Sequence, residues 1–221
     1  MSFFVTGTDT GVGKTHVTAM LLRGWKGAGG VALGYKPLAC GDRLDAERLR
    51  EAGADPELSL DAINPVYFRM AASPMAAGLI ENREADLAAV WAGFEALRER
   101  AETVFVEGVG GWLVPVTAAH SMADVAVALG LPVIVVVNNR LGALNHTLLT
   151  VESIRARGLP CVGLILNQVA ETRDAASISN RLLLERLLPE APVLAEVMYG
   201  EERLEQGVVE TLRSRWGPGR P

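Results

Sequence analysis

The residues with the clearest chemical potential lie near the start of the chain, in the stretch TGTDTGVGKT. Gly13, Lys14 and Thr15 have the types and the order found at the end of a phosphate-binding loop. In such a loop, backbone N–H groups face phosphate oxygens, the lysine reaches the terminal phosphates and the hydroxyl holds Mg²⁺. The usual pattern has a further glycine where this chain has Thr8, with Gly7 one residue earlier, so the loop is a variant. We therefore expect the chain to bind a nucleoside triphosphate with Mg²⁺.

Two carboxylates and a second lysine are candidates for action on the same phosphates. Glu107 ends the apolar run TVFVE just before several glycines, and a buried carboxylate there needs a partner such as Mg²⁺. A cap on the following element is the alternative for this residue. Asp45 in GDRLDAERL is a second candidate ligand, although its spacing fits an exposed helix position equally well and Asp42 competes with it. Lys36 in GYKP is expected to end a strand beside the phosphate-binding loop, where Pro37 restricts the backbone, with a surface lysine as the alternative.

A third group of polar residues follows the apolar run LPVIVVV, in the stretch NNRLGALNH. This loop is expected to turn into a helix near Leu144, with free backbone N–H groups around Gly142 to Asn145. Such groups can dock a carboxylate. Asn145 is equally well explained as the cap of the helix, and His146 is as ambiguous. His16, directly after the phosphate-binding loop, is expected to be structural or solvent-facing rather than catalytic.

Strands and helices have to alternate to bring these residues together. Six short apolar runs, rich in β-branched and aromatic residues, predict buried strands, and the segments between them show apolar residues at helical spacing. This alternation predicts an α/β fold with a doubly wound, mostly parallel sheet flanked by helices. Ligands bind at the carboxyl ends of the strands in such a sheet. The expected strands are 3–7, 30–36, 103–109, 131–137, 160–167 and 191–197, and the expected helices are 14–28, 84–101, 121–130, 145–157 and 174–188.

Composition and charge limit the classes of function. The chain has 221 residues, 49% of them apolar, and a net charge of −5. This negative charge argues against binding to nucleic acid or anionic membranes that depends mainly on electrostatic attraction. We expect one domain over 1–221, with a frayed end at 216–221. The apolar runs are shorter than the roughly 20 residues that cross a bilayer, and no secretory signal pattern is present, so the cytoplasm is the expected location. Cys40 and Cys161 are too few for a disulfide framework and lack metal-site spacing.

With these residues assembled, the chain resembles the dethiobiotin synthetase family, the ATP-dependent carboxylases of biotin synthesis. The resemblance rests on TGTDTGVGKT, GYKPLACG, VEGVGGWLVP, LGALNHTLLT and the region of Asn167, in the family's order over nearly the whole chain. It implies that 7,8-diaminononanoate and CO₂ form a carbamate, which ATP then phosphorylates. The second amine closes a ureido ring, and dethiobiotin, ADP and phosphate are released. The resemblance also implies a homodimer whose partners are small molecules, with no nucleic acid and no membrane.

The resemblance further implies roles for individual residues. Lys36 and Lys14 flank the transferring phosphoryl group as catalytic residues. Mg²⁺ is held by Thr15, Asp45 and Glu107. ATP binding is implied for Gly11, Val12, Gly13, Lys14, Thr15, His16, Asp45, Glu107, Gly108, Val109, Gly110, Asn167, Gln168, Met198, Tyr199 and Gly200. Substrate binding is implied for Thr10, Lys36, Cys40, Gly142 and Asn145, with the 142–145 loop holding the distal carboxylate of the diamine.

Several positions depart from the family pattern. Cys40 stands where many members have a serine or threonine, so a weaker thiol hydrogen bond replaces that of a hydroxyl. Met198 and Tyr199 replace a Pro-Trp pair near the base, which makes purine selectivity less secure than phosphate binding. A tyrosine that some members donate across the dimer to the substrate carboxylate has no clear match, and Ser179 or Asn180 falls at its position.

A switch ATPase of the partition or maturation type is the alternative function, because such proteins share the expected fold and phosphate-binding loop. Many of them carry a signature lysine near the start of that loop, where this chain has Gly7, Thr8 and Asp9. The chain also shows no basic or amphipathic tail suited to DNA or membrane. The combined motifs therefore favour the ligase.

Overall fold

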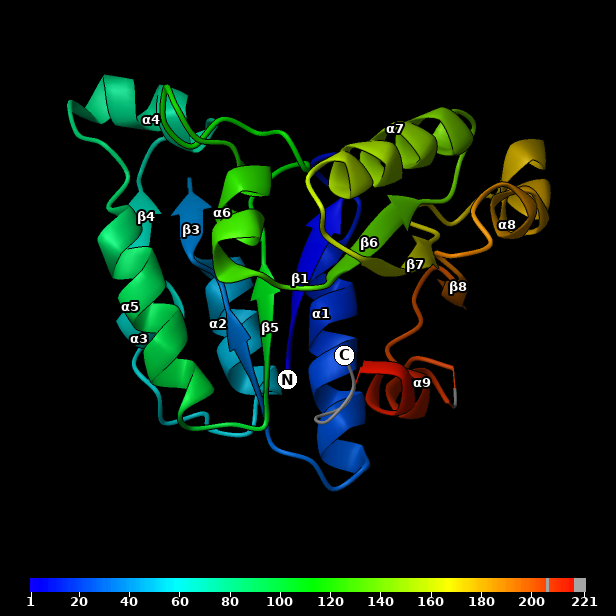
Figure 1. Ribbon diagram of the computed structural model, residues 1–221, viewed down its shortest axis with the longest axis horizontal. Coiled ribbons are helices and arrows are strands. Elements are labelled where there is room, and N and C mark those ends of the chain that lie inside the picture. The colour runs from blue at the N-terminus through cyan, green and yellow to red at the C-terminus, as the bar shows by residue number, and fades with distance from the viewer. Residues whose placement is uncertain (206, 217–221) are drawn as a thin grey trace.

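The computed structural model of the protein, which describes residues 1–205 and 207–216, contains a six-stranded parallel sheet (Figure 1). The strand order is β2-β5-β1-β6-β7-β8. Each predicted strand is present in this sheet, which confirms the predicted doubly wound α/β fold. The strands are β1 (Ser2–Gly7), β2 (Ala32–Tyr35), β5 (Thr103–Glu107), β6 (Val133–Asn138), β7 (Cys161–Asn167) and β8 (Val193–Val197).

Helices flank the sheet on both faces. From β1 the chain moves outward to β2 and returns to β5, and from there it proceeds in the opposite direction through β6, β7 and β8. Because crossovers between parallel strands are right-handed, this reversal places α1 and α7 on opposite faces, as Figure 1 shows. The helices are α1 (Lys14–Gly27), α2 (Leu44–Ala52), α3 (Leu60–Ile63), α4 (Pro74–Glu81), α5 (Leu87–Arg98), α6 (Met122–Leu129), α7 (Ala143–Ala156), α8 (Ala175–Leu187) and α9 (Val208–Trp216).

The five predicted helices correspond to α1, α5, α6, α7 and α8, whereas α2, α3, α4 and α9 are additional. A second, two-stranded parallel sheet, formed by β3 (Leu38–Cys40) and β4 (Val66–Phe68), is also additional. These strands have three residues each, which is too short for a recognisable periodicity. Trp216 is the last residue of α9, and the rest of the expected frayed end, 217–221, lies outside the described residues.

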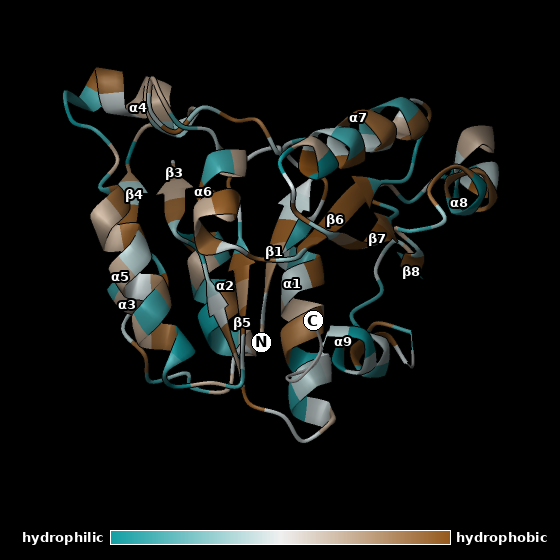
Figure 2. Ribbon diagram, in the orientation of Figure 1, coloured by the Kyte–Doolittle hydropathy of each residue, from teal (hydrophilic) through white to brown (hydrophobic). Residues whose placement is uncertain are grey.

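The interior is apolar along the whole sheet. Figure 2 shows brown, hydrophobic strands at the centre and helices that alternate between brown and teal around them. Phe3 and Phe105 stack at 5.6 Å between ring centroids, and Trp25 of α1 meets Phe105 edge-on at 5.7 Å. Aromatic packing of this kind fixes α1, and with it the loop before α1, against β1 and β5. Within 1–205 and 207–216, no helix has the length and apolar character needed to cross a membrane.

The carboxyl ends of the strands meet at one edge of the sheet, which lies at the upper side of Figure 1. The loop from β1 to α1 begins there after Gly7, and Lys36 follows β2 directly. Glu107 is the last residue of β5, and Asn139 and Gln168 come directly after β6 and β7. The fold therefore gathers the candidate residues, which are scattered along the sequence, at one place.

Candidate active site

The phosphate-binding loop wraps the N-terminal end of α1. Gly13 is the N-cap residue with a φ of 87°, and Lys14 and Thr15 form the first turn. Both side chains are almost fully buried. Lys14 Nζ donates to the carbonyl oxygen of Asp9 over 3.3 Å, and Thr15 Oγ1 donates to Glu107 Oε1 over 2.7 Å. The N-terminal end of a helix, carrying a lysine and a hydroxyl, is a built anion site.

Gly13 is required by its surroundings as well as by its backbone conformation. Asn167, at the end of β7, donates from Nδ2 to the Val12 carbonyl oxygen over 2.9 Å. A Cβ atom on Gly13 would lie 2.1 Å from that Nδ2. Gly11 has a similar φ of 73°, but a Cβ there would meet nothing within 4 Å. Asn167 thus supports the phosphate-binding loop directly.

Gly13→Ala is expected to weaken ATP binding at least about tenfold, because strain of about 1–3 kcal/mol adds to displacement of Asn167. Gly11→Ala carries the left-handed strain without the clash, and is therefore the matched control, with a smaller loss. Isothermal titration of both variants with ATP tests the difference. Equal losses in the two variants would contradict the role assigned to Asn167.

Lys36 forms the centre of a buried charge cluster with two carboxylates. Its Nζ donates to Glu107 Oε1 over 2.6 Å, to Asp45 Oδ2 over 2.8 Å and to the Gly108 carbonyl oxygen over 3.3 Å. Lys36 is only 2% exposed and Glu107 is 0% exposed, whereas the side chain of Asp45 is 45% exposed. The alternative of Lys36 as a surface lysine is therefore wrong, and so is that of Glu107 as a cap. The link through Glu107 Oε1 to Thr15 places Lys36 beside the phosphate-binding loop.

The turn after β2 fixes the backbone of Lys36, through residues that sequence reasoning missed. Asn64 is buried and donates from Nδ2 to the carbonyl oxygens of Lys36 and Val66, over 2.8 and 3.0 Å. Arg43 in turn donates from Nε to Asn64 Oδ1 over 3.0 Å. The available signal was the Asn-Pro pair formed by Asn64 and Pro65, which is typical of a turn. It carried no indication that the turn holds Lys36.

The two lysines have opposite shifts of pKa. Burial, together with the nearby Lys36 ammonium, lowers the pKa of Lys14 to about 8. Burial also acts to lower the pKa of Lys36, but Glu107 and Asp45 outweigh it, so that this pKa lies above its usual value. Burial likewise opposes the shift of Asp45, whose pKa the Lys36 ammonium holds below its usual value. Lys36 is therefore a fixed cation at neutral pH. Lys14 is also mostly charged at pH 7, but from about pH 8 upward a large share of it is neutral and can gain a proton when phosphates bind.

ATP binding is expected to take up about 0.5 proton at pH 8, rising to about 0.9 at pH 9. The pKa of Lys14 near 8 leaves that fraction of the side chain neutral in the free protein, and a bound triphosphate restores the ammonium. Titration calorimetry at each pH in two buffers of different ionisation enthalpy measures the uptake. A value near zero at both pH values would show that Lys14 is fully charged before ATP binds.

The oxygen atoms at this corner fit a magnesium ion. Within the described part of the chain, Glu107 Oε2 is buried with no hydrogen-bond partner, whereas Oε1 accepts two hydrogen bonds. Thr15 Oγ1 and the half-exposed Asp45 carboxylate complete a set of hard oxygen donors, the type that Mg²⁺ prefers. In the part of the chain that the structure describes, no group of three or more His, Cys, Asp or Glu side chains could hold a metal. Phosphate oxygens and water molecules would therefore complete the coordination shell.

The glycine-rich loop after β5 lies against the phosphate-binding loop. A Cβ on Gly111 would approach Asp9 Cα to 3.5 Å, and one on Gly110 would approach Thr10 Oγ1 to 3.5 Å. A cavity of about 400 Å³ opens beside these two loops, lined by Thr8, Asp9, Gly111, Trp112, Leu113, Val114, Pro115, Leu149, Thr150 and Ser153. A cavity of about 780 Å³ between α1 and residues 202–205 is larger, but none of the buried charges lines it. The 400 Å³ cavity adjoins the two glycine-containing loops, and another cavity, of about 560 Å³, is lined by Thr15 and His16 at the start of α1.

Comparison with known proteins identifies the family of the chain. A family model described as an AAA domain matches residues 1–202. The ATP-dependent dethiobiotin synthetase of Akkermansia muciniphila is 43% identical over 208 residues, covering 94% of this chain and 97% of that protein. That of Anaeromyxobacter dehalogenans strain 2CP-C is 47% identical over 194 residues, covering 86% of each. The chain belongs to the dethiobiotin synthetase family.

Solved structures of other proteins share the fold of this chain. A ParA family ATPase from Chlorobium tepidum aligns with a TM-score of 0.53 at 12% identity, over 98% of this chain and 90% of that one. The MinC:MinD cell division protein complex of Aquifex aeolicus aligns with a TM-score of 0.52 at 13% identity, over 96% of this chain and 85% of that one. At such identities the likeness concerns the fold alone.

In this member of the dethiobiotin synthetase family, the structure favours Asp45 over Asp42. Asp45 contacts Lys36, whereas Asp42 Oδ1 accepts the N–H of Leu44 where the chain enters α2. Helix α7 begins at Ala143, one residue before the expected Leu144. The alternative of Asn145 as its cap is wrong, because Gly142 is the N-cap residue, with a φ of 92°, and Asn145 lies inside the helix.

Other residues predicted to contact ligands lie at the end of β3, in α1 and in the loop after β8. Cys40 ends β3, and burial, with Glu81 nearby, raises the pKa of its thiol to about 11, so the thiol is neutral at physiological pH. His16 Nε2 lies 2.6 Å from the Glu201 carbonyl oxygen and joins α1 to the loop after β8. That loop holds Met198, Gly200 and Tyr199, the last 57% exposed. The ligand contacts of these residues stay predictions.

Gln168 and Asn167 differ in how their amides are used. Gln168 is buried and donates from Nε2 to the Ala170 and Thr172 carbonyl oxygens, over 3.1 and 3.2 Å. Its Oε1 has no partner. Asn167 directs its Nδ2 to Val12 instead. The resemblance implies that the Asn167 amide contacts the purine. Its Nδ2 is instead engaged with the phosphate-binding loop, so Oδ1 is the amide atom left for a base.

Proposed function

We propose that the protein forms dethiobiotin from 7,8-diaminononanoate, CO₂ and ATP, with release of ADP and phosphate. The observation that supports this proposal most directly is the position of the Lys36 side chain. Its ammonium is buried, held between Asp45 and Glu107, and joined through Glu107 to Thr15 of the phosphate-binding loop. Many switch ATPases of this fold instead carry their second lysine near the start of the phosphate-binding loop, where this chain has Gly7, Thr8 and Asp9. Membership of the dethiobiotin synthetase family supplies the substrate class.

The chemistry requires two anions to meet. One amine of the substrate attacks CO₂ and loses a proton, which gives an N-carboxylate. A carboxylate oxygen then attacks the γ-phosphorus of ATP, and the bond to the ADP oxygen breaks. The second amine attacks the carbonyl carbon of the resulting mixed anhydride and loses a proton, and the carbon–oxygen bond to phosphate breaks as the ring closes. Catalysis therefore depends on positioning and on neutralising charge.

The chain's own residues can meet both needs. Lys14 at the start of α1 binds the β- and γ-phosphates, together with backbone N–H groups of Gly11 to Gly13. Lys36, whose pKa is raised above its usual value by Glu107 and Asp45 despite burial, stays charged between the carbamate and the transferring phosphoryl group. Mg²⁺, held by Thr15, Asp45 and Glu107, would neutralise phosphate charge.

The diamine is proposed to lie between the Lys36 end of the site and the loop before α7. Thr10, Cys40 and Lys36 surround the reacting end, and Gly142 to Asn145 hold the distal carboxylate. Helix α7 favours an anion at its start, because it has no acidic residue in its first turn and no side-chain cap. The apolar walls of the 400 Å³ cavity, which include Trp112 and Leu149, suit a methylene chain.

The base of ATP is proposed to lie between the ends of β7 and β8. Among the described residues, Gln168 Oε1 is buried without a hydrogen-bond partner, and Asn167 directs its Nδ2 to Val12. Met198, Tyr199 and Gly200 lie in the loop after β8. We also propose a homodimer that acts in the cytoplasm on small molecules, without nucleic acid or membrane. Exposed leucine and isoleucine side chains on and next to α7 and α8 support a self-association surface; they are Leu141, Leu149, Ile178 and Leu182.

A coupled assay tests the proposal. ADP release is measured with ATP, Mg²⁺ and bicarbonate, with and without 7,8-diaminononanoate, and the product is identified by mass. We expect ADP release that depends on the diamine, with one dethiobiotin per ADP. Slow ATP hydrolysis that ignores the diamine but responds to DNA or a protein would instead support the switch ATPase.

A further inference from the structure

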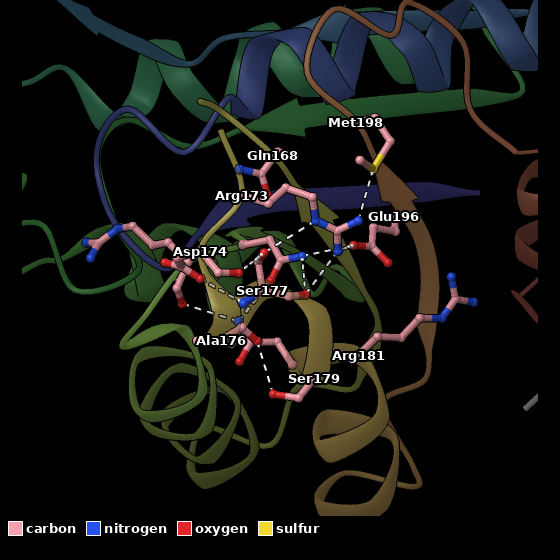
Figure 3. A network of polar contacts seen from close by, with 12 residues as sticks. Gln168, Arg173, Asp174, Ala176, Ser177, Ser179, Arg181, Glu196 and Met198 are labelled. Atoms are coloured by element: carbon pink, nitrogen blue, oxygen red, sulfur yellow. Dashed lines mark hydrogen bonds and ion pairs between the residues drawn. The ribbon is translucent and has the colours of Figure 1, made fainter. Parts of the chain in front are cut away.

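The loop that precedes α7 is held by the first turn of α8, in a polar network that the proposed reaction does not use (Figure 3). Asp174 is the N-cap residue of α8, where its Oδ1 accepts the Ser177 N–H over 2.8 Å. Its other oxygen, Oδ2, accepts the N–H of Leu141 over 2.7 Å. The Asp174 carboxylate thus caps the N-terminal end of α8 and also holds the loop that leads into α7.

Asn180 adds a second attachment. Its Nδ2 donates to Asn139 Oδ1 over 2.9 Å and to the Arg140 carbonyl oxygen over 3.2 Å. Asn139 is fully buried and donates from Nδ2 to the Ser177 carbonyl oxygen over 3.2 Å. Three successive loop residues, ending with Leu141, are therefore bonded to α8. The position of α8 sets the path of this loop.

The first turn of α8 is itself anchored to the sheet. Figure 3 shows Arg173 between Ser177 and Glu196 of β8. Arg173 Nη2 donates to the Ser177 carbonyl oxygen over 3.2 Å and to Glu196 Oε1 over 2.9 Å. The same Glu196 Oε1 accepts from Asn139 Nδ2 over 3.0 Å. The support of the loop therefore reaches a strand of the main sheet rather than ending in a free helix.

The held loop leads directly to the start of α7. Gly142, next to Leu141, is the N-cap residue of α7 and offers no side chain to satisfy the first N–H groups. The direction of those N–H groups depends on the backbone before them. Asp174 controls that backbone at the last residue before the cap.

We propose that Asp174 is a positioning residue for recognition of the substrate carboxylate, because it fixes the N-terminal end of α7 at which that carboxylate docks. The inference rests on the proposed function, which places the carboxylate at Gly142 to Asn145. Asp174 acts through Leu141 and touches no substrate. Its own charge is shared between two backbone N–H groups, those of Leu141 and Ser177.

Two variants and two substrates test this role in the full-length protein. Asp174→Ala removes both hydrogen bonds, and Asp174→Ser keeps an oxygen that can cap α8 while losing the one that holds Leu141. Each is assayed with 7,8-diaminononanoate and with 2,3-diaminononane, in which a methyl group replaces the carboxylate. Asp86→Ala is the matched control, because it removes the equivalent cap of α5. Among the residues that the structure describes, the Asp86 side chain accepts only the Ala89 N–H.

Both Asp174 variants are expected to raise the KM for 7,8-diaminononanoate about tenfold, with kcat and the KM for ATP within about twofold of wild type. The KM for 2,3-diaminononane should be the same in all four proteins, because that substrate does not use the loop. A tenfold rise with both diamines, or an equal rise in the KM for ATP, would overturn the inference while leaving the proposed function intact. An unchanged KM in Asp174→Ser would overturn it as well. A wild-type protein that is inactive with 7,8-diaminononanoate would overturn both the inference and the proposed function.

Discussion

Replacing Lys36 by alanine is expected to lower kcat about 10²–10³-fold while changing ATP affinity less than about threefold. The loss falls on kcat because the ammonium of Lys36 acts on charge that develops between the carbamate and the γ-phosphate. ATP stays bound because Lys14 and the glycine backbone of the phosphate-binding loop are unaltered. Steady-state kinetics of ADP release and calorimetric titration with ATP measure the two quantities separately.

The same substitution leaves Glu107 buried without its cation. Removing one partner of a buried pair costs about 3 kcal/mol, so the free energy of unfolding should fall by about that amount. Activity is therefore measured at a temperature at which circular dichroism shows the variant folded. Lys26→Ala is the matched control, because Lys26 is an exposed lysine in the last turn of α1. Turnover of the Lys36 variant equal to that of the control would remove Lys36 from the mechanism.

The sheet was predictable because its signals are local. Each strand is a continuous apolar run, as expected for a parallel strand that is buried on both faces, and β6 shows this most clearly. The phosphate-binding loop was predictable for the same reason, since its glycine, lysine and threonine are adjacent in sequence. Residues of β3 and β4 gave no such signal, and neither did the short helix α3.

The site required the order of the strands, which local patterns do not contain. Lys36 and Glu107 are separated by 71 positions and meet because β2 and β5 are neighbours, with Tyr35 beside Val106 in register. Reasoning from strand ends placed both residues at the correct edge but could not pair them. The attachment of Leu141 to Asp174 depends on how α8 packs, and the sequence offers only a capping residue there.

Glu107→Gln is expected to abolish the increase in ATP affinity that Mg²⁺ produces and to lower kcat about 10³-fold, with the fold retained. The reason lies in how the two carboxylate oxygens are used. Thr15 and Lys36 both donate to Oε1, and no residue in 1–205 or 207–216 forms a hydrogen bond with Oε2. A glutamine can keep its carbonyl oxygen at the Oε1 position and preserve both hydrogen bonds, while an NH₂ group replaces the free oxygen, which cannot then ligate a metal.

The comparison of variants separates a ligand from a structural partner. Glu107→Ala loses both hydrogen bonds and leaves the Lys36 cation buried with only the half-exposed Asp45, so it should lose about 3 kcal/mol of stability. Glu57→Gln, at an exposed position, controls for the change of charge. ATP affinity is titrated with and without Mg²⁺, and unfolding is followed by circular dichroism. A different outcome is that Glu107→Gln keeps the increase in ATP affinity that Mg²⁺ produces and still loses turnover. Glu107 would then act by holding the Lys36 ammonium, because a residue that only orients that ammonium changes the rate without changing the effect of Mg²⁺ on ATP binding.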